Sequence, residues 1–113
     1  MLRIRTFDEP HAIRLKLEGK VIRAWIPEAR RVWMEASNGK ELIIDLSDVT
    51  FVDDRGRRLL AEMHAAGASL IGAGPMIGAL IDDIRREMPR AQSGRVQEVL
   101  FFLLGLLLIF AKF

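Results

Sequence analysis

The sequence predicts a single α/β domain built on a small, mostly parallel sheet. Of its 113 residues, 50% are hydrophobic and 28% are charged, which is typical of one globular domain with one core. Segments with apolar residues at every second position alternate with segments in which they recur at helical spacing. The predicted order is ββαβαβα. Helical crossovers between the last three strands make them parallel, and the first strand joins antiparallel at one side.

The N-terminal residues predict two paired strands. Residues 2–7 and 12–17 alternate apolar and polar side chains, which is the pattern of half-buried strands. A turn containing Pro10 separates these segments, so the two strands are expected to pair antiparallel. Gly19 is expected to end the second strand and open the connection to the next element.

A helix is predicted from residue 24 to residue 37, because the apolar period becomes helical there. Pro27 lies in the predicted first turn, where its missing N–H costs nothing. Trp25 and Trp33 share the apolar face and are expected in the core. The Asn-Gly pair at 38–39 tolerates positive φ and ends the helix.

The second half of the domain predicts two further strands and two helices. Residues 42–46 form an apolar run interrupted by Asp45, which predicts a central strand covered on both faces. A short acidic loop leads to a helix with the apolar stripe Leu59, Leu60, Met63 and Ala66. Residues 69–71 are the last predicted strand. A turn at 72–75 then opens a third helix with apolar residues Met76, Ile77, Leu80, Ile81 and Ile84.

Composition excludes several classes of function. The net charge of +2 and the pI of about 9.5 come from scattered arginines, which is no nucleic-acid signature. Without cysteine, the chain has no disulfide, thiolate metal site or Cys nucleophile. The N-terminus alternates apolar and charged residues and lacks the apolar core of a secretory signal, so a cytoplasmic location is expected.

The acidic loop before the second helix offers several interpretations. Asp53 or Asp54 is expected to be the helix N-cap, because a carboxylate there accepts unpaired backbone N–H groups. An acid/base carboxylate pair is an alternative, although adjacent side chains usually point apart. A Mg²⁺ site is a further alternative and would use Asp45, Asp48, Asp53 and Asp54.

Other candidate motifs favour structural interpretations. The glycine-rich segment 72–78 follows a strand, but its spacing misses the dinucleotide fingerprint and Pro75 removes a needed N–H. His11 and His64 are far apart and have no metal-ligand spacing. No nucleophile elbow is present. We therefore expect neither a metal, a cofactor nor a catalytic site.

The segment Asp45-Leu-Ser-Asp-Val-Thr-Phe-Val-Asp-Asp-Arg-Gly-Arg-Arg-Leu-Leu60 resembles the signature of STAS domains, the fold of bacterial anti-sigma-factor antagonists. In that family a strand ending in Asp-Leu-Ser leads to Asp-Ser-Ser-Gly or Asp-Ser-Thr-Gly and a helix. Leu17-Glu-Gly19 resembles the family's Leu-x-Gly, and the ββαβαβα order agrees. The resemblance covers roughly residues 10–87 and implies a bacterial regulatory protein-interaction module that is not an enzyme.

The resemblance also implies a departure from the family's switch. In switching members, the serine after the motif Asp is phosphorylated by a kinase that is itself an anti-sigma factor. Here Asp53 matches the motif Asp and Gly56 matches the Gly, while Asp54 falls on the phospho-acceptor and Arg55 on the next position. A carboxylate cannot accept that phosphate, and its single negative charge only partly mimics a phosphoserine.

Three functions remain open. The leading hypothesis is binding of an anti-sigma-factor-type partner through Asp53, Asp54, Arg55, Gly56, Arg57 and Arg58. For the three arginines, a solvated helix face is the alternative to recognition of an acidic partner. A second hypothesis, also implied by the family, is a STAS subunit of a phospholipid-trafficking ABC transporter that binds the ATPase. A third is a small-molecule or nucleotide binder.

The C-terminus differs from the domain. We expect a STAS-like domain at 1–88, a linker at 89–98 and a hydrophobic tail at 99–113. Residues 99–111 are uncharged, and as a helix they would reach roughly 20 Å, short of the roughly 30 Å of a hydrocarbon core. Contact with the inner membrane, packing on the domain, homodimer formation and an atypical gene end are the alternatives for this tail.

Overall fold

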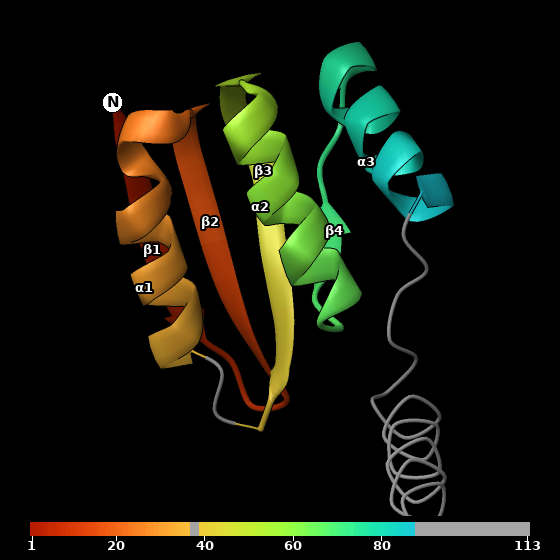
Figure 1. Ribbon diagram of the computed structural model, residues 1–113. Coiled ribbons are helices and arrows are strands. Elements are labelled where there is room, and N and C mark those ends of the chain that lie inside the picture. Colours follow the sequence, from red (N-terminus) through yellow and green to blue (C-terminus); the bar gives the residue numbers. More distant parts are fainter. Residues whose placement is uncertain (37–38, 88–113) are drawn as a thin grey trace, which may run out of the picture.

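The computed structural model describes residues 1–36 and 39–87, in which helices cover one face of a four-stranded sheet (Figure 1). The elements in chain order are β1 (Leu2–Asp8), β2 (Ala12–Val21), the short 3-10 helix η1 (Arg23–Trp25), α1 (Ile26–Ala36), β3 (Glu41–Val52), α2 (Asp54–Ala65), β4 (Ser69–Ile71) and α3 (Pro75–Glu87). The predicted α/β class and the order ββαβαβα are confirmed. The 3-10 turn η1 is an addition that the sequence did not indicate.

The sheet has the predicted topology. Its strand order is β1-β2-β3-β4, with β1 antiparallel to β2 and the pairs β2/β3 and β3/β4 parallel. The short strand β4 pairs only with Ile43–Asp45 of β3. Since both crossovers after β2 contain a helix, the three parallel strands end at the edge of the sheet where α1, α2 and the final helix α3 begin (Figure 1).

Two strands are longer than predicted. Strand β2 continues past Gly19 to Val21, and β3 continues to Val52, because residues 18–21 pair with residues 48–52. The register shifts on either side of Gly19, whose φ is 103°. Gly19 therefore permits an irregularity within the strand and does not end it. Most of the predicted acidic loop is the second half of β3.

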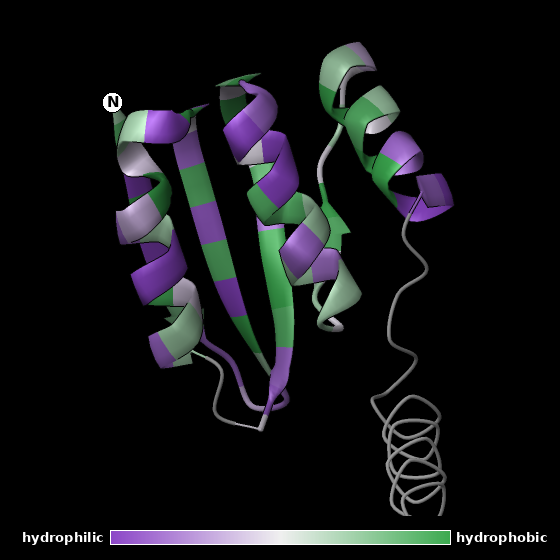
Figure 2. Ribbon diagram, viewed as in Figure 1, coloured by the Kyte–Doolittle hydropathy of each residue, from purple (hydrophilic) through white to green (hydrophobic). Residues whose placement is uncertain are grey.

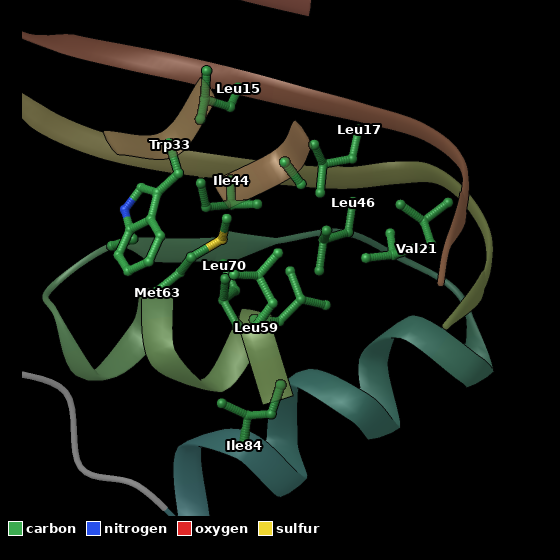
Figure 3. Packing of buried hydrophobic residues seen from close by; sticks show 14 of the residues in the cluster. Leu15, Leu17, Val21, Trp33, Ile44, Leu46, Leu59, Met63, Leu70 and Ile84 are labelled. Carbon is green, nitrogen blue, oxygen red and sulfur yellow. The ribbon is translucent and has the colours of Figure 1, made fainter. Parts of the chain in front are cut away.

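The core lies between the sheet and the helices. Alternate residues of β2 point toward the helices, and Figure 2 shows this alternation of apolar and polar positions along the strand. The largest fully buried side chains are Leu15, Leu17, Val21, Ile44, Leu46, Leu59, Leu60, Met63, Leu70 and Ile84. Figure 3 labels all of them except Leu60. The predicted stripe of α2 is confirmed at its first three positions. Ala66, the fourth, is exposed at the C-cap.

The opposite face of the sheet is polar, which corrects the prediction that β3 is covered on both faces by apolar layers. All three helices contribute to the one core cluster on the other face. Cross-strand ion pairs occupy the polar face: Arg5–Glu18 (2.7 Å), Lys16–Asp48 (2.9 Å) and Arg14–Asp45 (3.2 Å). Asp45 interrupts the apolar run because its side chain belongs to this face.

The two tryptophans have different environments. Trp33 is 9% exposed and belongs to the core, as predicted, whereas Trp25 is 36% exposed. The chain forms η1 at residues 23–25, and α1 begins only at Ile26, so Trp25 does not lie on the inner stripe of the helix. Similarly, Met76 in the first turn of α3 is 45% exposed, although it was expected in the core.

The predicted linker at 89–98 and the tail at 99–113 lie outside the described residues. Among the helices within 1–36 and 39–87, none is long and apolar enough to span a membrane.

The first turn of α2 lies directly against the end of β2. A Cβ atom at Gly56 would stand 2.0 Å from the carbonyl oxygen of Val21, so a larger residue cannot occupy this position without moving backbone. The N–H of Asp53 donates to the same carbonyl at 3.2 Å. Gly56 is therefore required by the close approach of a helix to a strand.

Replacing Gly56 with alanine should destabilise the domain by about 3 kcal/mol or more, because the methyl group overlaps backbone that cannot yield cheaply. Gly78 is the matched control, since it is also helical and a Cβ there would meet nothing within 4 Å. Gly78→Ala should stabilise the domain by about 0.5 to 1 kcal/mol. Urea unfolding followed by circular dichroism measures both changes, and equal effects would contradict this account of Gly56.

Candidate functional site

Asp53 holds the beginning of α2 in place. One carboxylate oxygen accepts the N–H of Gly56 and the other accepts the N–H of Arg23, each at 2.8 Å. The first bond is an N-cap, which confirms the prediction that one of the two aspartates caps this helix. The second bond ties α2 to η1. One side chain therefore fixes the distance between the two helical segments that flank it.

These bonds also set the charge state of Asp53. The Gly56 N–H and then the Arg23 N–H lower its carboxyl pKa, with a smaller contribution from Arg55. Both oxygens already accept backbone donors, and a carboxyl group with a lowered pKa is a poor proton donor. This arrangement does not support the acid/base alternative for the two adjacent aspartates.

The four aspartates considered as Mg²⁺ ligands do not converge. Asp45 accepts the hydroxyl (2.6 Å) and the N–H (3.0 Å) of Ser47 and pairs with Arg14, while Asp48 pairs with Lys16. Although burial raises the pKa of Asp45, the bonds from Ser47 and Arg14 outweigh burial, and the net pKa is lowered. In the described part of the chain, no three acidic or histidine side chains cluster as a metal site would require.

The glycine-rich segment at 72–78 is a packed turn between β4 and α3. A Cβ atom at Gly72 would lie 2.6 Å from a side-chain carbon of Ile77 and 3.3 Å from Cβ of Leu46. Gly74 has a φ of 98°, which suits glycine. Close packing therefore explains Gly72 and a positive φ explains Gly74, in agreement with the interpretation of the segment as a turn.

The basic residues at the start of α2 point in two directions. Arg57 reaches α3, where its guanidinium lies 2.7 Å from a carboxylate oxygen of Glu87. Arg55 and Arg58 instead line a pocket on the other side, between α2 and the η1–α1 segment. Asp54, the first residue of α2, is exposed. The six predicted site residues therefore lie on the N-cap and the first two turns of α2 but do not form one patch.

The pocket has a volume of about 250 Å³ and is formed by eight residues from two segments. We call it the arginine groove, and it is lined by Arg23, Ile26, Pro27, Arg30, Arg55, Arg58, Leu59 and Glu62. Arg30 and Glu62 form an ion pair across it, with 2.6 Å between nitrogen and oxygen. Sequence reasoning missed Arg23, Arg30 and Glu62. Their helical spacing was visible in the sequence, but the packing of α1 against α2 was not.

Changing Asp53 tests its two bonds separately. Asp53→Ala removes both acceptors and should lower the midpoint of thermal unfolding more than Asp53→Asn, because asparagine still caps the helix but cannot accept the Arg23 N–H with its amide nitrogen. Equal midpoints for the two variants would show that the bond from Gly56 contributes nothing to stability, and equal midpoints for the parent and Asp53→Asn would show the same for the bond from Arg23.

The pH dependence of this effect has a defined direction. Because folding lowers the pKa of Asp53, its stabilisation is complete above the pKa of the unfolded side chain, about 4, and is lost as the pH falls through the folded-state pKa. The difference in thermal midpoint between the parent and Asp53→Asn should therefore shrink below about pH 4. A difference that stays constant from pH 7 to pH 3 would contradict this assignment.

Comparisons with known proteins identify the fold. No family model and no curated protein matches the sequence. The structure is similar to that of an anti-sigma factor antagonist from Mycobacterium paratuberculosis, with a TM-score of 0.65 and 17% identity over 79% of this chain and 84% of that one. It is also similar to an uncharacterised DUF3478-family protein with a SpoIIAA-like fold from Shewanella loihica, with a TM-score of 0.51 and 13% identity over 79% of this chain and 81% of that one.

Both likenesses agree with the fold that the Asp-Leu-Ser and Asp-Asp-Arg-Gly segments indicate. The chain has the STAS-like, or SpoIIAA-like, fold of anti-sigma factor antagonists.

Proposed function

We propose that this protein is a non-enzymatic interaction module that binds a regulatory protein of the anti-sigma-factor type through the surface around residues 53–58. The observation that carries the proposal is that neighbouring charged residues at the start of α2 have different environments. Asp53 is engaged by two backbone N–H groups, whereas Asp54, Arg55 and Arg58 are exposed on the turn that Asp53 holds rigid. A rigid turn with exposed charges of both signs suits recognition of another protein.

Exposed apolar side chains near the same edge of the sheet support a protein partner over a small molecule. Phe51 is 49% exposed at the end of β3, Trp25 is 36% exposed in η1, and Met76 is 45% exposed at the start of α3. Figure 1 shows that these three segments and the start of α2 lie at one end of the molecule. Aromatic residues, Met and Arg are the types enriched in protein interfaces.

The partner would be bound without the phosphorylation switch. Asp54 occupies the position that matches the family's phospho-acceptor serine and carries one permanent negative charge, compared with about −1.5 to −2 for a phosphoserine. The binding state of the module would then be set by partner concentration alone. In this respect the chain would differ from family members that are released or bound according to phosphorylation.

Asp54→Ser and Asp54→Ala should leave the thermal midpoint nearly unchanged, because the side chain is exposed, and should change the amount of partner recovered. The measurement is affinity co-purification from cells, with identification and quantification of each recovered protein. Asp82→Ser is the matched control, since Asp82 is an exposed aspartate on α3. Recovery of an anti-sigma factor by the parent supports the proposal.

Equal recovery of the same partner by the parent, both Asp54 variants and the control would remove Asp54 from the contact. Recovery of no regulatory protein by any of them would overturn the proposed function itself.

The uncharged run at 99–111 favours a second candidate, a STAS subunit of a phospholipid-trafficking ABC transporter that binds the ATPase at the inner membrane face. Deleting residues 96–113 should then move the protein from the membrane fraction to the soluble fraction, because about 0.8 kcal/mol of membrane affinity is lost with each apolar CH₂ group removed. Fractionation of cells checks this result. Identical distribution of the full-length and truncated proteins would dismiss the membrane role.

A further inference from the structure

We infer that the arginine groove binds an acidic segment of a protein partner and that this segment inserts one large apolar side chain between α1 and α2. The inference rests on the proposed function and specifies the chemistry of the partner. It extends the predicted contact from Arg55 and Arg58 to Arg23, Arg30 and Glu62, which sequence reasoning missed.

The groove has two continuous walls. One wall consists of residues 23, 26, 27 and 30 and the other of residues 55, 58, 59 and 62, so both follow the i, i+3, i+4, i+7 spacing of a single helix face. Ile26 and Pro27 supply apolar surface between the charged residues, while the side chain of Leu59 is fully buried. The groove therefore combines an apolar floor with a basic rim.

The charge of the groove is largely uncompensated. Of its four arginines, only Arg30 has a carboxylate partner, Glu62, in the described part of the chain. Arg23, Arg55 and Arg58 are exposed and take part in none of the ion pairs formed within residues 1–36 and 39–87. Guanidinium groups stay charged at any physiological pH and match carboxylates with two donors each. An acidic occupant fits this rim.

The size of the groove selects between classes of occupant. Its volume of about 250 Å³ lies below the range of roughly 300 to 1,000 Å³ that is common for small-molecule sites. It is large enough for one apolar side chain, with carboxylates of the same segment at the rim.

The walls are held at a fixed separation before any partner binds. The carboxylate of Asp53 joins the N–H of Arg23 in one wall to the N–H of Gly56 beside the other. The Arg30–Glu62 pair connects the walls again two turns further along α2. A preformed groove loses little conformational entropy on binding, which favours recognition of a short segment.

Direct peptide binding tests the inference. The probe is a fluorescein-labelled peptide with one Phe flanked on each side by Glu residues, and its matched controls replace Phe with Ser or every Glu with Gln. We expect the first peptide to bind the full chain, both control peptides to bind at least about tenfold more weakly, and added salt to weaken binding. Fluorescence anisotropy measures each dissociation constant.

Charge reversal of the groove provides the protein variants. Arg55→Glu combined with Arg58→Glu should weaken binding by at least about tenfold, and the milder Arg55→Gln with Arg58→Gln should weaken it by several fold. The control is Arg3→Glu with Lys40→Glu, which changes the net charge equally on β1 and beside the start of β3. It should bind like the parent. Thermal unfolding of each variant verifies that the fold is retained.

Three results would overturn the inference. If the control pair weakened binding equally, binding would depend only on the net charge of the protein. If the Phe and Ser peptides bound equally, the inserted apolar side chain would contribute nothing to binding. Binding of phosphatidylglycerol vesicles that is lost in the groove variants, without peptide binding, would assign the arginines to a lipid surface.

Co-purification tests the proposed function separately from the groove. A partner recovered equally by the parent and the groove variants would refute the groove alone. Failure to recover any regulatory protein would refute the proposed function, while the peptide measurement would still decide the groove.

Discussion

The contact between the first turn of α2 and the end of β2 determines how the candidate site of this protein is arranged. The Val21 carbonyl accepts the N–H of Asp53 and leaves no room for a side chain at Gly56. Asp53 in turn accepts backbone N–H groups from Gly56 and Arg23. Strand, 3-10 turn and helix are thereby joined within a few residues. The same carboxylate links the two segments that form the walls of the arginine groove.

The same junction explains why neighbouring residues of one short motif have different roles. Asp53 faces the backbone and is used for structure, whereas Asp54 is exposed on the next position. Arg57 faces α3 and pairs with Glu87, while Arg55 and Arg58 face α1 across the groove. Because a helix turns by about 100° for each residue, consecutive charges serve three different surfaces. A contiguous motif in sequence is therefore not a contiguous site.

Different interactions stabilise the two faces of the sheet. Apolar side chains from every strand except β1 are fully buried against the helices, and burial of such surface is the main favourable contribution to folding. On the other face, ion pairs such as Arg14–Asp45 link neighbouring strands, and Arg14 also lies 4.4 Å from the centre of the Phe7 ring. Hydrogen bonds within the Asp-Leu-Ser segment, on which the family resemblance rests, explain its two polar residues. Asp45 accepts two hydrogen bonds from Ser47.

The sequence by itself determined the class, the order of elements, the parallel and antiparallel pairings and the presence of an aspartate cap on α2, because apolar periodicity and N-cap chemistry are local properties of the chain. Only the structure decided that the cap is Asp53 and not Asp54. The sequence did not determine that β3 extends to Val52 or that Gly19 lies within a strand, since polar residues there are held extended by pairing with β2. Nor did it determine the arginine groove. Its two walls are about 30 residues apart in the chain and meet only because the core places α1 beside α2.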